Sequence, residues 1–220
     1  MATRPKQAVP RPAPRLYLTT PPISDASAFS LQLGSAMGAG DVAAVLLRLA
    51  DSDERTLINR AKAIAALVQD RDAALLLDGR VELVARAGAD GAHLTGMTTF
   101  TEAFPRLKPE RIAGAGGLAT RHDAMQAAEQ GADYVMFGEP DAASGAQPAF
   151  EAIEERVAWW AELFECPCVA YAASLDEIAP LVAAGADFIA LGDFLWRDPD
   201  AIKTTTSEAS RLLGMPEPAA

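Results

Sequence analysis

Short apolar runs alternate along the chain with longer segments whose apolar residues recur at helical spacing. In residues 54–69, for example, Leu57, Ile58, Ala61 and Ile64 fall on one helical face. The other predicted helices are residues 24–37, 150–164, 174–184 and 198–213. The apolar runs between helices are predicted strands: residues 16–20, 42–48, 73–77, 91–94, 111–114, 134–138, 168–171 and 188–191. This alternation predicts a parallel sheet covered by helices.

The phrase Gly-Ala-Asp recurs and begins at Gly88, Gly131 and Gly185. Each copy ends an alanine-rich helical stretch and precedes a predicted strand, and glycine suits the left-handed position that closes a helix. The copies start 43 and 54 residues apart, and at roughly 20–30 residues per strand–helix unit this spacing covers about two units. We therefore predict a single (β/α)8 TIM barrel over residues 16–213, with a Pro/Arg-rich flexible tail at 1–15 and a loose tail at 214–220.

The composition argues against nucleic-acid-binding, membrane-spanning and secreted classes of protein. Half of the 220 residues are apolar, which is enough for one core, and the formal net charge of −11 argues against a nucleic-acid partner. No apolar run approaches the roughly 18 residues that cross a membrane, and no secretory leader is expected. Cys166 and Cys168 are expected as reduced thiols on one face of a strand, which indicates the cytoplasm.

The loops after the strands are where such barrels carry their chemistry. Arg48 ends the second predicted strand, and its planar guanidinium suits a clamp for phosphate or carboxylate, or else a salt bridge at the rim. Asp78 follows the third strand, where it would hold a metal, act as a base or cap the next helix. His93 ends the fourth strand, where ligand contact and a satisfied role in the core are both open.

Further candidates follow the later strands. A glycine-rich turn from Gly114 to Gly117 leads toward a helix that begins near Arg121. Backbone donors of this turn, helped by Arg121, would bind an anion, although a plain tight turn explains the glycines equally well. Glu139 and Asp193 follow the sixth and eighth strands, and several acids at one mouth would hold a cation or repel an anion.

Taken together, these phrases resemble the thiamine phosphate synthase family, which includes a thiazole tautomerase branch. The resemblance covers roughly residues 16–195 and rests on five segments: residues 16–19, 78–81, 88–94, 131–138 and 185–187. It implies a phosphate-binding barrel and a transferase that joins a hydroxymethylpyrimidine pyrophosphate to a thiazole phosphate, with magnesium, and releases pyrophosphate. It also implies that Arg48 holds the pyrophosphate, that Asp78 contacts the metal or the pyrimidine amine, and that His93 contacts the pyrimidine.

The chain departs from the family pattern mostly where the chemistry lies. Of the polar residues in the family's Gln-Leu-Arg-x-Lys only Arg48 remains, and the second magnesium carboxylate, expected shortly after His93, is missing. Asp193 replaces a serine that helps to hold phosphate in the family. A carboxylate about 4 Å from a phosphate oxygen repels it by roughly 1–4 kcal/mol, depending on the local dielectric.

Two functions therefore stay open at the level of sequence. The first is a divergent thiamine phosphate synthase with Mg²⁺ at Asp78. The alternative is a catalytically degenerate paralogue that binds a thiamine-related or other cationic ligand, or regulates a partner. Both place a small molecule at the carboxyl-terminal mouth of the barrel. Trp159 and Trp160 fit either a subunit contact in a homo-oligomer or a ring buried against the barrel.

Overall fold

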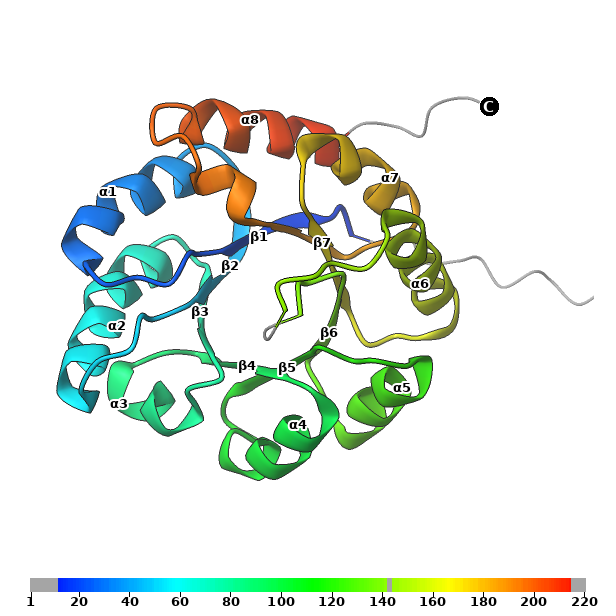
Figure 1. Ribbon diagram of the computed structural model, residues 1–220, viewed down its shortest axis with the longest axis horizontal. Helices are drawn as coiled ribbons and strands as arrows, with labels where there is room; N and C mark the ends of the chain where they lie inside the picture. The colour runs from blue at the N-terminus through cyan, green and yellow to red at the C-terminus, as the bar shows by residue number, and fades with distance from the viewer. Residues whose placement is uncertain (1–11, 142–143, 215–220) are drawn as a thin grey trace, which may run out of the picture.

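A computed structural model describes residues 12–141 and 144–214 as a closed barrel of eight parallel strands, paired in the order of the sequence (Figure 1). The strands are β1 (Arg15–Thr19), β2 (Val42–Leu47), β3 (Ala74–Asp78), β4 (Gly91–Thr95), β5 (Ile112–Gly116), β6 (Tyr134–Phe137), β7 (Cys168–Ala172) and β8 (Phe188–Leu191). The predicted (β/α)8 barrel is thus confirmed, because every predicted strand overlaps an observed one.

Helices surround the barrel on its outside (Figure 1). They are α1 (Ala26–Met37), α2 (Glu54–Gln69), α3 (Val84–Ala87), α4 (Met97–Ala103), α5 (Arg121–Gln130), α6 (Phe150–Leu163), α7 (Ile178–Ala183) and α8 (Ile202–Leu213). The shortest ones, α3 and α7, are preceded by 3-10 turns, so their periodic segments are only partly α-helical. The predicted tails at 1–15 and 214–220 lie mostly outside the described residues, although β1 already begins at Arg15.

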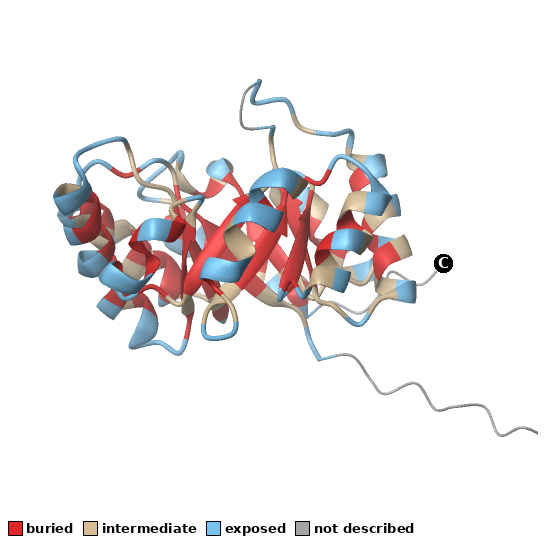
Figure 2. Ribbon diagram, turned by 90° about the horizontal axis from the view of Figure 1, so that it is seen from below, coloured by how far each residue is buried: buried red, intermediate tan, exposed pale blue. Residues whose placement is uncertain are grey.

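Two apolar clusters form the core, and Figure 2 shows the buried strands between less buried helices. The larger cluster lies between the strands and the helices and includes Leu18, Leu33 and Ile64. The smaller one contains barrel-facing residues such as Leu46 and Met136. Because side chains alternate along a strand, one set of positions fills the barrel and the other seats the helices.

The repeated Gly-Ala-Asp phrase has a structural role that explains its recurrence. Its glycines have positive φ values of 71°, 103° and 95° at the ends of α3, α5 and α7. Its aspartates accept hydrogen bonds from backbone N–H groups at the start of the preceding strand. Asp90 accepts from Leu75 at 2.7 Å, and the two other copies repeat this bond on β5 and β7. The phrase therefore ends a helix and ties two neighbouring strands together.

One local prediction needs correction, and the helix predicted at 174–184 begins without a side-chain cap. Cys166 precedes β7, so it does not share a strand face with Cys168, and neither thiol forms a disulfide. Ser174 makes no capping hydrogen bond through its side chain. Glu177 accepts a hydrogen bond from the backbone N–H of Ala173 at 2.6 Å.

Candidate functional site

Two adjoining cavities lie at the carboxyl ends of the strands. The first, of about 320 Å³, extends between the ends of β1, β2, β3, β7 and β8. The second, of about 400 Å³, lies beside β5 and β6. Thr95, Met136 and Glu139 line both cavities. The segment after β6 crosses this end of the barrel (Figure 1), so the mouth has both a floor of strand ends and a partial cover.

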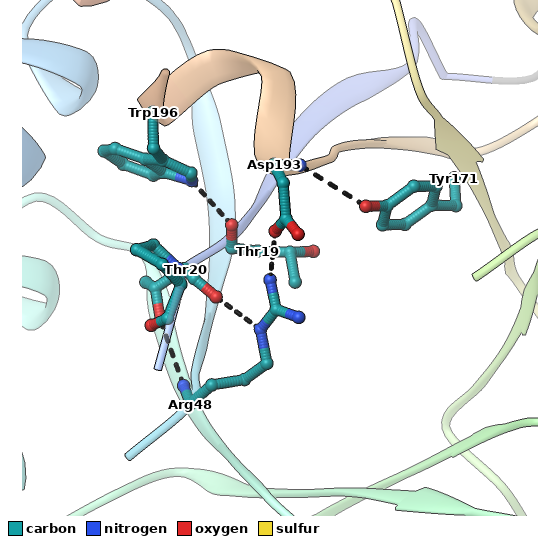
Figure 3. Close-up of polar contacts among 7 residues, drawn as sticks. Thr19, Thr20, Arg48, Tyr171, Asp193 and Trp196 are labelled. Carbon is teal, nitrogen blue, oxygen red and sulfur yellow. Dashed lines mark hydrogen bonds and ion pairs between the residues drawn. The ribbon is translucent and has the colours of Figure 1, made fainter. Parts of the chain in front are cut away.

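Arg48 is held in place at the rim of the first cavity. Its Nε donates to the backbone carbonyl of Thr20, and one terminal nitrogen pairs with the carboxylate of Asp193 (Figure 3). The backbone N–H of Arg48 also donates to the hydroxyl of Thr20 at 3.0 Å. This ion pair brings together two predicted site residues that belong to opposite ends of the sequence, and it balances the charge of Asp193.

Thr19 and Tyr171 line the same end of the cavity and were not singled out by the sequence. In Figure 3 the Thr19 side chain lies between the guanidinium of Arg48 and the ring of Tyr171. Thr19 is only 4% exposed, and its hydroxyl has no hydrogen-bond partner among the described residues. The Tyr171 hydroxyl accepts a hydrogen bond from the backbone N–H of Asp193 at 3.3 Å.

A chain of hydrogen bonds crosses the barrel interior beneath the mouth. The Tyr17 and Tyr134 hydroxyls are 2.8 Å apart, Tyr134 is 2.9 Å from Nδ1 of His93, and Nε2 of His93 is 2.9 Å from a Glu139 carboxylate oxygen. His93 is 1% exposed, so both ring nitrogens are used inside the protein. The sequence left open whether His93 contacts a ligand or has its hydrogen bonds satisfied in the core. The geometry fits the second role, and the bond from His93 holds Glu139 at the wall of the cavities.

Electrostatics within this network follow from burial. Burial lowers the pKa of His93, but the carboxylate of Glu139 and, more weakly, that of Asp78 outweigh it, so the pKa is raised. Burial raises the pKa of Tyr17 and Tyr134, which keeps both phenols protonated. His93 therefore tends to carry a positive charge against Glu139.

Asp78 lines the first cavity at the end of β3. Its carboxylate makes no hydrogen bond with the residues that the structure describes, so it is available to a ligand. Burial raises the pKa of Asp78, and nearby Glu139 adds to this effect, while His93 opposes it. Ionisation of this carboxyl therefore costs stability in the folded protein.

Replacing Asp78 with asparagine should raise the melting temperature at pH 8. Because the pKa of Asp78 is raised in the folded state, the fold tolerates the protonated carboxyl better than the ionised one. The contribution of this carboxyl to the free energy of unfolding is therefore highest at low pH and falls as the pH rises through the folded-state pKa. The gain of the Asn variant should therefore shrink toward pH 4. Thermal unfolding at both pH values, with the exposed Asp51→Asn as control, measures it; an unchanged melting temperature at pH 8 would contradict the buried charge.

The turn predicted from Gly114 to Gly117 is mostly strand, because β5 continues to Gly116, and its glycines serve different purposes. A Cβ atom at Gly114 would overlap the ring of Tyr134 inside the barrel, so this residue makes room for a core side chain. A Cβ at Gly116 would overlap His93 and Glu139, which shows how closely their pair sits against β5. Gly117, with a φ of 57°, borders the second cavity. Of the predicted turn, Gly117 is the residue that reaches a cavity.

Gly114→Ala should destabilise the protein by about 1–3 kcal/mol, because the added methyl group overpacks the barrel against Tyr134. Chemical denaturation measures this loss. Gly34→Ala in α1 is the matched control, because its nearest neighbour would lie at an ordinary 3.9 Å. If Gly114→Ala instead kept full stability and only weakened binding of an anion, the glycine would belong to the site and not to the core.

Arg121 does not reach either cavity. Its guanidinium pairs with Glu155 at 2.7 Å and lies 4.8 Å from the centre of the Trp159 ring, both on α6. Trp160 is buried and donates to the carbonyl of Cys166 at 2.7 Å. Arg121 therefore joins α5 to α6, and the tryptophan pair has one ring in the core.

The donor set at the mouth fits Mg²⁺ bound with a substrate. Mg²⁺ usually takes one or two protein carboxylates and completes its shell with water and substrate phosphates. Asp78 offers one such carboxylate, whereas no group of three or more His, Cys, Asp or Glu side chains suited to a metal occurs among the described residues. Within those residues, too, no helix is both long and apolar enough to cross a bilayer.

Comparisons with known proteins agree with this architecture. The family model described as thiamine monophosphate synthase matches residues 16–194. The thiamine-phosphate synthase of Rhodospirillum centenum is 40% identical over 201 residues, covering 90% of this chain and 97% of the relative. That of Hyphomonas neptunium is 39% identical, covering 88% and 90%.

Among solved structures, a thiamine phosphate pyrophosphorylase from Pyrococcus furiosus superposes with a TM-score of 0.72 over 90% of this chain and 95% of its own. Its sequence identity is 21%, so this likeness concerns the fold. The family match spans all eight strands, and the relatives are covered almost end to end. The chain belongs to the thiamine monophosphate synthase family.

Proposed function

We propose that this protein transfers the pyrimidinylmethyl group of a hydroxymethylpyrimidine pyrophosphate to the ring nitrogen of a thiazole. The C–O bond to pyrophosphate breaks, pyrophosphate leaves with the electron pair, and a C–N bond forms, which makes the thiazole ring cationic. The observation that carries the proposal is the pair of adjoining cavities at the strand ends of a barrel that matches the family along its whole length. Two cavities with a shared wall suit two substrates that must meet.

Arg48 is the residue proposed to bind pyrophosphate. Its planar guanidinium faces the first cavity, and bidentate binding of phosphate oxygens is a property of this group. The hydrogen bond from its Nε to the Thr20 carbonyl fixes its position before substrate arrives, and the backbone N–H of Arg48 donates to the Thr20 hydroxyl. Asp193 neutralises it in the ligand-free state, and an arriving pyrophosphate would share or replace that partner.

The two remaining acids have separate proposed roles. Asp78 would be a carboxylate ligand of Mg²⁺, which when bound would offset the negative charge of the pyrophosphate. Glu139, on the wall between the cavities, would face the positive charge that develops on the pyrimidinylmethyl carbon and stays on the thiazole ring. His93 would act as a positioning residue that fixes the orientation of Glu139.

Turnover of the pyrimidine pyrophosphate with a thiazole acceptor and Mg²⁺ tests the proposal directly. Pyrophosphate release and product formation above a control without enzyme are expected. The alternative of a non-catalytic thiamine binder draws on the Arg48–Asp193 pair, which occupies the cationic group in the absence of ligand. A folded sample without turnover, yet stabilised against heat by thiamine independently of Mg²⁺, would decide for the binder.

A further inference from the structure

A cavity with an unusual concentration of cations lies on the outside of the barrel. Helices α2 and α3 are neighbours there (Figure 1), and the cavity between them, the α2–α3 cavity, has a volume of about 400 Å³. It is lined by Arg55, Ile58, Asn59, Lys62 and Arg86, and none of these residues lines the two cavities of the mouth. Three of the five side chains are cationic, although the chain has 30 acidic residues against 19 Lys and Arg. The α2–α3 cavity therefore gathers positive charge on a chain that is acidic overall.

Two of these cations have no partner among the described residues. Arg55 and Lys62 are exposed, and within that part of the chain their side chains form neither an ion pair nor a hydrogen bond. Arg86 pairs with the carboxylate of Glu54 at the start of α2. An anion in the cavity would give Arg55 and Lys62 a partner and would compete with Glu54 for Arg86.

The spacing of the polar groups on α2 suits a chain of phosphate groups. Arg55, Asn59 and Lys62 follow one another at intervals of four and three residues, so they lie on one helical face over about 10 Å. A linear di- or triphosphate extends along such a row and pairs with several cations at once, whereas a single phosphate requires the long side chains to converge on one point. Because the cations surround a hollow instead of a flat face, they suit a small ligand better than the surface of an acidic protein.

We propose that the α2–α3 cavity is a second anion site of this protein, separate from the mouth, and that it binds the di- or triphosphate group of a small molecule. Arg55 and Lys62 supply the unpaired charges, with the guanidinium of Arg55 able to bind two phosphate oxygens at once. Asn59 adds a neutral donor, and Arg86 closes the opposite side from α3. The assignment does not depend on the proposed function, because the mouth contributes no residue to it.

Calorimetric titration at low salt and without Mg²⁺ tests the site, with inorganic tripolyphosphate and ATP as probes. An Arg48→Ala protein isolates it, because the mouth then lacks its proposed phosphate-binding arginine. This protein should bind one tripolyphosphate per chain, and inorganic phosphate at least about tenfold more weakly, since fewer charged pairs form. Tighter binding of ATP than of tripolyphosphate would assign the phosphate chain to a nucleotide, and the reverse order would assign it to an inorganic anion.

Variants of the cavity make the test specific. Lys62→Ala should weaken tripolyphosphate binding by about tenfold, the effect of one lost charge-assisted bond. Lys203→Ala removes an exposed lysine from α8 and is the matched control for net charge, so it should change the affinity by less than about twofold. Glu54→Gln releases Arg86 and should strengthen binding severalfold.

Three results would overturn the site. Equal losses for Lys62→Ala and Lys203→Ala would mean that only net charge matters, and equal affinities for phosphate and tripolyphosphate would remove the phosphate chain. Binding that the unaltered protein shows and Arg48→Ala loses would place the anion at the mouth alone. The titration requires no turnover, so the site is judged separately from the synthase activity, and Lys62→Ala by itself should keep the kcat/KM of the unaltered protein. Melting temperatures of all variants ensure that folded proteins are compared.

Discussion

Replacing Arg48 with alanine is expected to lower kcat/KM for the pyrimidine pyrophosphate by about 100-fold or more, because preorganised charge at a leaving group contributes this much to catalysis. Two bonds, to the Thr20 carbonyl and to the Asp193 carboxylate, hold the guanidinium at the cavity before substrate binds. Removing it leaves Asp193 unbalanced beside the incoming anion, which adds repulsion to the loss of attraction. Steady-state kinetics of pyrophosphate release measures the effect.

Two variants sharpen this experiment. Arg48→Lys keeps the charge but loses the planar fork and the bond to the Thr20 carbonyl, so it should recover only a small part of the rate. Arg15→Ala breaks the comparable Arg–Asp pair at the amino ends of the strands and should leave the rate near that of the unaltered protein. An Arg48→Ala protein with undiminished kcat/KM would show that pyrophosphate binds elsewhere.

The barrel could be predicted from the sequence because its signals are local. Each Gly-Ala-Asp phrase contains the glycine that ends one helix and the aspartate that anchors the next pair of strands. Because these bonds recur with the strand–helix unit, the spacing of the phrases indicates the order of strands and helices. Strand positions then follow from periodicity, with errors of a residue or two at their ends. Helices follow less well, because α3 and α4 were not among the predicted helices and α7 and α8 each begin four residues later than predicted.

The partners within the site could not be predicted in the same way. Arg48 and Asp193 are 145 residues apart in sequence, and His93 and Glu139 are 46 apart. Which side chains meet depends on the stagger of strands around the barrel, and no local pattern encodes it. Asp193 and Glu139 therefore looked like uncompensated acids at the mouth, whereas the fold places a cationic or titratable partner against each.

The polar positions of the first strand could also have pointed to the site. On β1, Tyr17 and Thr19 alternate with Leu16 and Leu18, so the first strand carries a polar stripe that faces the barrel interior. A polar stripe inside a barrel requires partners, and Tyr134 supplies one for Tyr17. The hydroxyl of Thr19 lacks such a partner, which is why it marks the ligand end of the stripe.

Glu139→Ala is expected to destabilise the protein by about 3 kcal/mol, because it leaves the buried His93 without its partner at Nε2. Glu139→Gln keeps a hydrogen-bond acceptor and should lose only about 1 kcal/mol. Urea denaturation near pH 6 measures both. Glu155→Ala, which breaks the exposed pair with Arg121, is the control and should cost less than about 1 kcal/mol.

The pH dependence of this loss distinguishes an ion pair from a neutral hydrogen bond. The pKa of His93 is raised in the folded protein, so the stabilisation from its charged form is complete below the unfolded value of about 6.5 and disappears as the pH rises through the folded-state pKa. The difference between the unaltered protein and Glu139→Gln should therefore be largest near pH 6 and shrink in alkaline solution. A difference that stays constant across this range would mean that His93 is neutral when folded, and that Glu139 is held by a hydrogen bond and not by charge.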